Sequence, residues 1–191
     1  MIRFTPTENS KPQIGDILLS EPFLNDPYFG RKAVLLCENN KSGSFGLVLN
    51  NIIDTDITEV ISDFPDPNAK VSLGGPVSRS NLFFLHTSEK IKDAKKVIDG
   101  IYLGGDFEQL KEVIDTSPKT IKYRLFIGYS GWSDGQLMDE IQSKSWFVTT
   151  IENNRIMDSS IKNEEYWKNL IKNMGDGYTH IAQAPIDPNL N

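Results

Sequence analysis

The sequence contains a single cysteine, Cys37, and only two histidines, His86 and His180. One cysteine cannot form a disulfide within the chain, which favours a reducing compartment and predicts a cytoplasmic protein. Zinc sites draw on clustered cysteine and histidine ligands, whereas these three residues are spread from position 37 to position 180. We therefore expect no metal and no cofactor. Cys37 ends an apolar run beside Glu38, so a buried, inert thiol is expected there.

Long apolar runs are missing as well, and basic residues are outnumbered. No run of about 18 consecutive apolar residues occurs, so no membrane-spanning helix is predicted, and residues 1–6 lack the apolar stretch of a signal peptide. The chain carries 20 Lys and Arg against 26 Asp and Glu, a formal net charge of −6. Nucleic-acid affinity is built largely from cationic contacts to phosphate, so this composition argues against a nucleic-acid partner.

Motifs of the common enzyme classes are absent too. The sequence has no Walker loop and no glycine-rich dinucleotide motif. Gly128-Tyr129-Ser130-Gly131-Trp132 resembles a nucleophile elbow, but that turn requires glycine two positions after the serine, where this chain has tryptophan. Nucleotide binding and serine hydrolysis therefore have no motif support.

What the sequence does contain is typical of one globular domain. Its 191 residues are 38% hydrophobic and 24% charged, and a chain of this length can bury a substantial core. Polar, proline-containing segments begin and end it. We therefore expect an N-terminal arm over residues 1–13, a single domain over 14–181 and a flexible tail over 182–191.

The pattern of apolar residues predicts an α+β fold. Apolar and alternating runs predict strands at 16–20, 33–37, 45–49, 71–73, 82–85, 100–103, 122–128 and 146–148. Helical spacing predicts helices near 57–61, 106–115, 137–141 and 166–174. Asp106 and Gln109 are placed to cap the second helix, and Gly175 to end the last. The irregular order of strands and helices favours a mostly antiparallel or mixed sheet.

Two glycine-rich bends are the most distinctive features. In the first bend, residues 74–77, paired glycines allow unusual backbone angles and could bring amide donors close to a ligand, with Arg79 nearby for an anion. The alternative is a tight crossover of two packed backbones. In the second bend, residues 128–135, three glycines lie beside Tyr129 and Trp132, which implies a close approach to a strand or a ligand. Ser133 and Gln136 have the spacing of a capping box. We expect the two bends to meet at an accessible hollow.

These segments resemble, in order, the signature blocks of the YqgE/AlgH family of bacterial proteins. The blocks are Gly15 to Leu19, Asp26 to Phe29, Gly46 to Asn50, Gly74 to Val77, Leu82 to His86, and Gly128 to Leu137 with Glu140, Ile141 and Trp146. The resemblance implies a mixed α/β domain whose bifurcated sheet curls into a pseudo-barrel with flanking helices. For function it implies little beyond one branch described as a regulator of alginate synthesis.

The chain also departs from the family pattern. Asn50-Asn51-Ile52 stands where relatives commonly carry Asn-Arg-Pro, which removes a cation from a plausible ligand surface. Asn39 stands where many have histidine, and Ser130 replaces the commoner alanine. A serine nucleophile therefore cannot be a shared family mechanism, and any anion site of relatives is weakened here.

Three functions stay open. The first is a non-enzymatic binding or regulatory module that presents the two bends to an unknown protein or small molecule. The second is a small-pocket enzyme in which His86 is the acid–base group, Arg79 holds an anion and Asn50 orients the substrate. The third is a transcription-related regulator. The candidate ligand-binding residues are Asn50, Gly74, Gly75, Pro76, Arg79, His86, Gly128, Tyr129, Gly131, Trp132 and Gln136.

Overall fold

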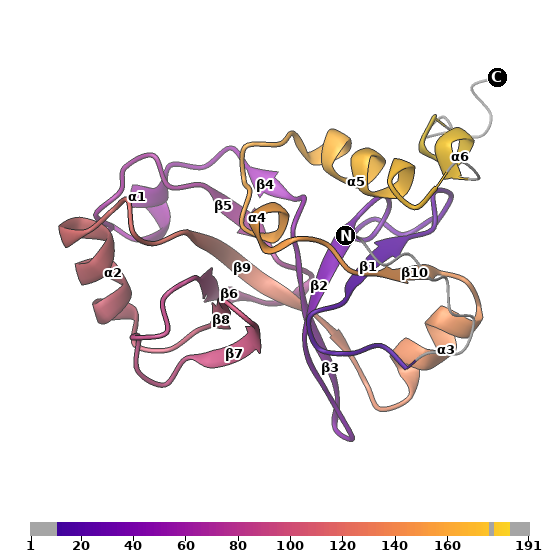
Figure 1. Cartoon of the computed structure of the whole chain (residues 1–191), viewed down its shortest axis with the longest axis horizontal. Helices are drawn as coiled ribbons and strands as arrows, with labels where there is room; N and C mark the ends of the chain where they lie inside the picture. Colours follow the sequence, from indigo (N-terminus) through magenta and orange to yellow (C-terminus); the bar gives the residue numbers. More distant parts are fainter. Residues whose placement is uncertain (1–10, 176–177, 184–191) are drawn as a thin grey trace.

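The computed structural model describes residues 11–175 and 178–183 (Figure 1). Its strands are β1 (Ile17–Ser20), β2 (Ala33–Asn40), β3 (Gly43–Val48), β4 (Ile52–Ile53), β5 (Val71–Leu73), β6 (Val77–His86), β7 (Lys95–Ile98), β8 (Ile101–Leu103), β9 (Tyr123–Trp132) and β10 (Trp146–Thr149). Its helices are α1 (Ile57–Val60), α2 (Phe107–Thr116), α3 (Gln136–Gln142), α4 (Asn153–Ile156), α5 (Asn163–Lys172) and α6 (Thr179–Gln183).

Strand β9 holds the sheet together. Its first half pairs parallel with β5 and antiparallel with β6, whereas its last residues pair antiparallel with β3. The strand order β10-β1-β2-β3-β9-β6-β8-β7 therefore splits at β9, with β4 and β5 forming a branch. The expected α+β class and the bifurcated, mostly antiparallel sheet are confirmed. The pseudo-barrel that the family resemblance implies does not form: across the described strands the order is an open path, so the sheet does not close into a barrel.

The helices cover the sheet because its strands are apolar on both faces. In β1, Ile17 and Leu19 face the cluster that includes Trp167 and Leu170 of α5, whereas Leu18 faces the cluster of α3 on the opposite side. Successive side chains of a strand point to opposite faces, which explains why the run is apolar throughout. In Figure 1, α5 and α3 accordingly lie on opposite sides of β1 and β10, while α1 and α2 cover the other end of the molecule.

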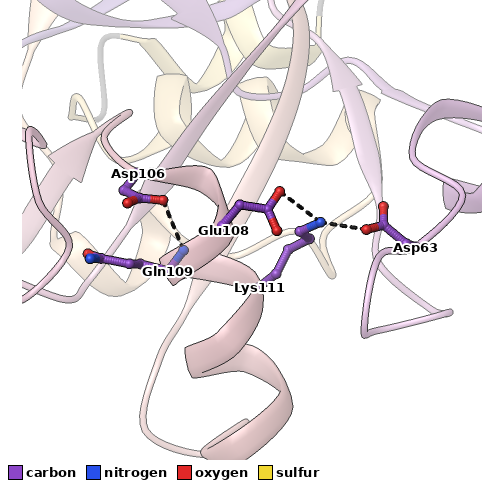
Figure 2. Close-up of polar contacts among 5 residues, drawn as sticks. All are labelled: Asp63, Asp106, Glu108, Gln109 and Lys111. Atoms are coloured by element: carbon purple, nitrogen blue, oxygen red, sulfur yellow. Dashed lines mark hydrogen bonds and ion pairs between the residues drawn. The ribbon is translucent and has the colours of Figure 1, made fainter.

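Helix α2 begins as predicted. The Asp106 carboxylate accepts a hydrogen bond from the Gln109 backbone amide at 3.1 Å, which satisfies one free donor of the first turn (Figure 2). Figure 2 also shows Lys111 between Glu108 and Asp63, at 2.9 and 2.6 Å. The ion pair to Asp63 joins α2 to the segment after α1. Because both carboxylates are exposed, these ion pairs orient α2 more than they stabilise it.

Arg124 joins the sheet to the C-terminal segment. Its buried guanidinium donates to the carbonyl of Leu49 at 2.5 Å and to that of Ile156 at 2.8 Å, and it lies over the Phe126 ring. Burial lowers the pKa of Arg124 to about 10, so the group stays charged at neutral pH. This contact holds α4 against the end of β3.

The structure adds elements that the apolar pattern does not predict. Strand β6 extends back to Val77, and β4, β7, α4 and α6 were not expected. The predicted hairpin forms from β2 and β3 with a register shift between Leu36 and Glu38. Of the expected arm and tail, residues 1–10 and 184–191 lie outside the described residues. Pro12 and Ala182, at their described edges, are buried.

Candidate functional site

The two glycine bends meet each other, backbone against backbone. A Cβ on Gly74 would lie 2.3 Å from the Gly128 carbonyl oxygen, and a Cβ on Gly75 would lie 2.3 Å from the Tyr129 carbonyl. The Gly74 carbonyl accepts hydrogen bonds from the Val48 amide and the Ser130 hydroxyl, both at 3.0 Å. Gly74, Gly75 and Gly128 are buried. The crossover alternative therefore accounts for these glycines, because no larger residue allows so close an approach.

The second bend also anchors α3. The Glu140 carboxylate accepts hydrogen bonds from the indoles of Trp132 and Trp146 at 2.8 and 2.7 Å, and from the Gln136 amide at 2.9 Å. Half of the expected capping box forms, because the Gln136 side-chain oxygen accepts a hydrogen bond from the Ser133 backbone amide at 3.0 Å. The Gln136 backbone amide donates to the Ser133 carbonyl and not to its hydroxyl, and the helix begins at Gln136 with Gly135 as its N-cap residue. The φ of Gly135 is +78°, in the left-handed region that glycine favours. The exposed side chain of Gln136 thus links Ser133 to Glu140.

A hollow does lie beside the bends, between the β2–β3 hairpin and the end of β9. Its volume is about 400 Å³, and three candidate residues line it: Tyr129, Gly131 and Trp132. Tyr129 stacks on Phe45 at 4.7 Å between ring centroids. Val77 of the first bend also lines this hollow, whereas Gly74, Gly75 and Pro76 do not, so both bends border it.

His86 is enclosed in the interior. Its side chain is fully buried, its Nε2 lies 2.9 Å from the Gly104 carbonyl, and its ring stacks on Tyr102 at 5.7 Å. Its Nδ1 has no hydrogen-bond partner among the described residues. Burial lowers the pKa of His86, and the backbone groups of Gly104 and Ser88 oppose this shift in part. The histidine is therefore held in its neutral form.

This burial predicts a pH dependence of stability. Below the ordinary histidine pKa of 6.5, the unfolded chain binds a proton that folded His86 does not, so the free energy of unfolding falls as the pH drops. The slope for one proton is at most about 1.4 kcal/mol per pH unit. Urea unfolding of wild type and His86→Phe at pH 7.5 and 5.5 measures it. The variant should lose less stability than wild type over this interval, whereas equal losses would show that His86 does not contribute.

The three residues of the enzyme hypothesis do not share a pocket. Arg79 is exposed near the start of β6, with its guanidinium 5.5 Å from the Tyr28 ring. His86 ends the same strand, which places the two up to about 23 Å apart at roughly 3.3 Å per residue. Asn50 is buried, and its amide is hydrogen-bonded to the backbone of Ala33, Arg31 and Asn163. This geometry does not support joint catalysis.

Cys37 and Ser130 are also enclosed. Burial, aided by the charge of Glu38, raises the pKa of the Cys37 thiol well above its usual range, which suppresses the reactive thiolate. Ser130 is fully buried, and its hydroxyl donates a hydrogen bond to the Gly74 carbonyl. Asn39 joins the N-terminal segment to the hairpin, because its amide donates to the Pro12 carbonyl at 2.7 Å.

A larger opening, which we name the α5 cavity, lies between the loop after β1 and the first turns of α5. Its volume is about 720 Å³. The wall comprises Pro22, Phe23, Leu24, Asn25, Asp26, Pro27, Gly30, Arg31, Lys32, Asn50, Asn163, Glu164 and Lys168. Cavities of this size bind small molecules in many proteins. Asn50 alone among the candidate residues lines it.

Asn50 and Asn163 shape the α5 cavity. Hydrogen bonds of 2.8 to 2.9 Å connect the Asn50 side chain to the 31–33 segment and to the first residue of α5. Asn163 pairs with Ile52 through both its amide oxygen and nitrogen, each at 2.9 Å. Arg31 has a φ of 54°, which is uncommon for a side-chain-bearing residue, and its guanidinium lies 5.4 Å from the centre of the Trp167 ring. The asparagines therefore position two consecutive cations at the wall.

Lys32 is the second of these cations. Its ammonium lies 3.5 Å from the Asn50 carbonyl and 3.4 Å from Oδ1 of Asn51. Burial lowers the pKa of Lys32. A cation thus stands beside Asn51, where the family resemblance implies an arginine.

Sequence reasoning missed Arg31, Lys32, Asn163 and Lys168, because the fold brings together residues more than a hundred positions apart. The available signals were Asn50 and the block from Asp26 to Phe29, of which Asp26 and Pro27 form part of the wall. Among the residues that the structure describes, no group of three or more His, Cys, Asp or Glu side chains could hold a metal ion. No helix in the described ranges is long and apolar enough to span a membrane.

Comparisons with known proteins agree over nearly the whole chain. A family model described as AlgH-like matches residues 17–179. A UPF0301 protein of Cytophaga hutchinsonii is 40% identical over 181 residues, covering 93% of this chain and 98% of the relative. One of Parabacteroides distasonis is 41% identical over 184 residues, covering 94% and 92%.

Two solved structures share the fold. A crystal structure of a Corynebacterium diphtheriae protein superposes with a TM-score of 0.76 at 20% identity, over 94% of this chain and 96% of the other. The solution structure of the AlgH protein from Pseudomonas aeruginosa gives 0.62 at 24% identity, over 78% and 84%. The extent of the family match and the identity to the UPF0301 relatives together show that the chain belongs to the AlgH-like family.

Proposed function

We propose that this protein is a non-enzymatic binding or regulatory module whose small-molecule ligand occupies the α5 cavity. The observation that carries the proposal is the cavity itself, about 720 Å³ in volume, whose wall combines apolar and cationic residues. Apolar walls that carry a few polar groups are typical of small-molecule sites.

The environment of the reactive side chains favours binding over chemistry. His86, Ser130 and Cys37 are each buried and face backbone groups. None of the three lines the α5 cavity. An enzyme built on His86 and Arg79 is therefore the weaker alternative, and the net charge of −6 also places a transcription-related role behind binding. A cytoplasmic location stays a prediction from the lone cysteine.

A fragment screen by two-dimensional NMR tests this proposal. Neutral and charged fragments are added to the labelled protein, and the spectrum of each fragment is followed for a day. We expect at least one fragment to shift the amides of Phe23–Lys32 and Asn163–Lys168 together, in a saturable way, while remaining chemically unchanged. Conversion of a bound fragment, or shifts confined to other surfaces, would contradict a non-enzymatic module at this cavity.

Two residues of the same loop supply matched variants. Phe23 lines the cavity and is 50% exposed, whereas Tyr28 is 44% exposed and lies outside the cavity wall. Both can therefore be shortened at small cost to stability. Phe23→Ala should weaken fragment binding about tenfold, the effect of losing roughly 1.4 kcal/mol of apolar contact, and Tyr28→Ala should leave it unchanged. Equal effects of the two variants would argue against the cavity.

A further inference from the structure

The net charge of the α5 cavity wall is opposite in sign to the net charge of the whole chain. Three cationic side chains, Arg31, Lys32 and Lys168, line it with two carboxylates, Asp26 and Glu164. The chain overall carries a formal charge of −6. A cationic wall in an acidic protein attracts anions to that place and repels them elsewhere.

The two carboxylates of the wall already interact with other groups of the protein. Asp26 accepts hydrogen bonds from the amides of Tyr28 and Phe29 at 2.7 and 2.9 Å, which closes a turn in the loop. Glu164 interacts electrostatically with Arg31. Lys168 lies 3.6 Å from Glu165, on the same helix. Of the wall cations, Lys32 is therefore the one whose charge the protein compensates least.

Within the described part of the chain, the Lys32 ammonium contacts only neutral oxygens. Its two contacts, to the Asn50 carbonyl and the Asn51 amide, are 3.5 and 3.4 Å long, at the outer limit of hydrogen bonding. No carboxylate within the described residues forms an ion pair with it. A half-buried ammonium without a counter-ion is costly, and a bound anion would remove that cost.

The apolar part of the wall indicates what accompanies the anionic group. Pro22, Phe23, Leu24 and Pro27 present apolar surface to the cavity. Phe23 is half exposed although it is aromatic, so covering it with a ligand would be favourable. A free inorganic ion would leave this wall exposed to water.

We propose that the ligand of the α5 cavity is a small organic anion, with a carboxylate or phosphate group paired to Lys32 and an apolar body against Phe23 and Leu24. This inference rests on the proposed binding function and adds the chemical class of the ligand. Charge-assisted hydrogen bonds contribute roughly 1.5–3 kcal/mol, so the anionic group should matter by tenfold or more.

Matched probes separate charge from shape. Phenylacetate, phenyl phosphate and the neutral phenylacetamide are titrated into the full chain, and binding is followed by the amide shifts of Phe23–Lys32. At least one acid should bind about tenfold more tightly than the amide, and the tighter of the two acids identifies the preferred anionic group. Equal binding of acids and amide would overturn the anion inference while leaving the binding function intact. If no probe shifts these amides, both proposals are contradicted.

Lysine variants locate the charge partner. Lys32→Gln should lower the affinity for the acid to that for the amide, whereas Lys32→Arg should keep the preference. Lys172→Gln is the control, because it removes one positive charge from the exposed end of α5, outside the cavity wall. Thermal unfolding of each variant confirms that the fold is intact. An unchanged preference in Lys32→Gln, or an equal loss in Lys172→Gln, would exclude Lys32 as the partner.

Discussion

Replacing Gly74 with alanine is expected to lower the free energy of unfolding by about 3 kcal/mol, the upper end for overpacking, because a clash with backbone cannot relax through a rotamer change. The added methyl carbon would lie 2.3 Å from the Gly128 carbonyl oxygen and 3.0 Å from a Leu47 methyl. Relief requires β5 and β9 to separate, which would break the hydrogen bond from Ser130 as well. Urea unfolding followed by tryptophan fluorescence measures the loss, since Trp132, Trp146 and Trp167 are all buried.

Gly135→Ala is the matched control for this prediction. Gly135 has a φ of +78°, but nothing lies within 4 Å of an added Cβ. Its cost is therefore conformational alone, about 1–2 kcal/mol. If Gly74→Ala costs no more than Gly135→Ala, the close contact between the two bends is not what requires glycine at position 74.

The second large effect is expected at Glu140. In Glu140→Ala, the indole N–H groups of Trp132 and Trp146 lose their shared acceptor, and both rings are more than nine-tenths buried. Each unsatisfied buried donor costs about 1–3 kcal/mol, so the free energy of unfolding should fall by roughly 3–4 kcal/mol. Helix α3 would lose its main polar contact with the sheet. Chemical denaturation and a shift in tryptophan emission report both effects.

Asp139→Ala is the natural comparison for Glu140→Ala. It removes the same charge from the neighbouring position of α3, where the side chain is exposed. We expect a loss of about 0.5 kcal/mol or less, from helix-dipole and propensity effects. Similar losses in both variants would mean that the charge of α3, rather than the indole hydrogen bonds, stabilises this part of the fold.

The sequence predicts those parts of the fold that depend on interactions between residues close together in the chain. The β2–β3 hairpin, the Asp106 cap and the apolar stripe of α5 each follow from spacing within a few residues. Strand β7 could not be predicted in the same way, because its two lysines are exposed and its pairing with β8 depends on a partner. Tertiary context decides such elements.

The candidate site was only partly predictable. Asn50 was identified, and it lines the α5 cavity while its side-chain amide holds the backbone of Arg31 and Asn163. The glycine bends were identified as close approaches, yet whether they approach a ligand or each other depends on which strands pair. The α5 cavity combines Lys32 with Lys168, and no local pattern connects residues so distant in sequence.

The pairing of β1 with β10 has a consequence for synthesis on the ribosome. Ile17 is among the first core residues to be made, but its partner Thr149 follows only after most of the chain has been translated. Until then the outer edge of β1 presents unpaired amide and carbonyl groups, a surface that invites association between nascent chains. Slowing translation before residue 146 should therefore promote aggregation, and a chaperone that shields strand edges should counteract it.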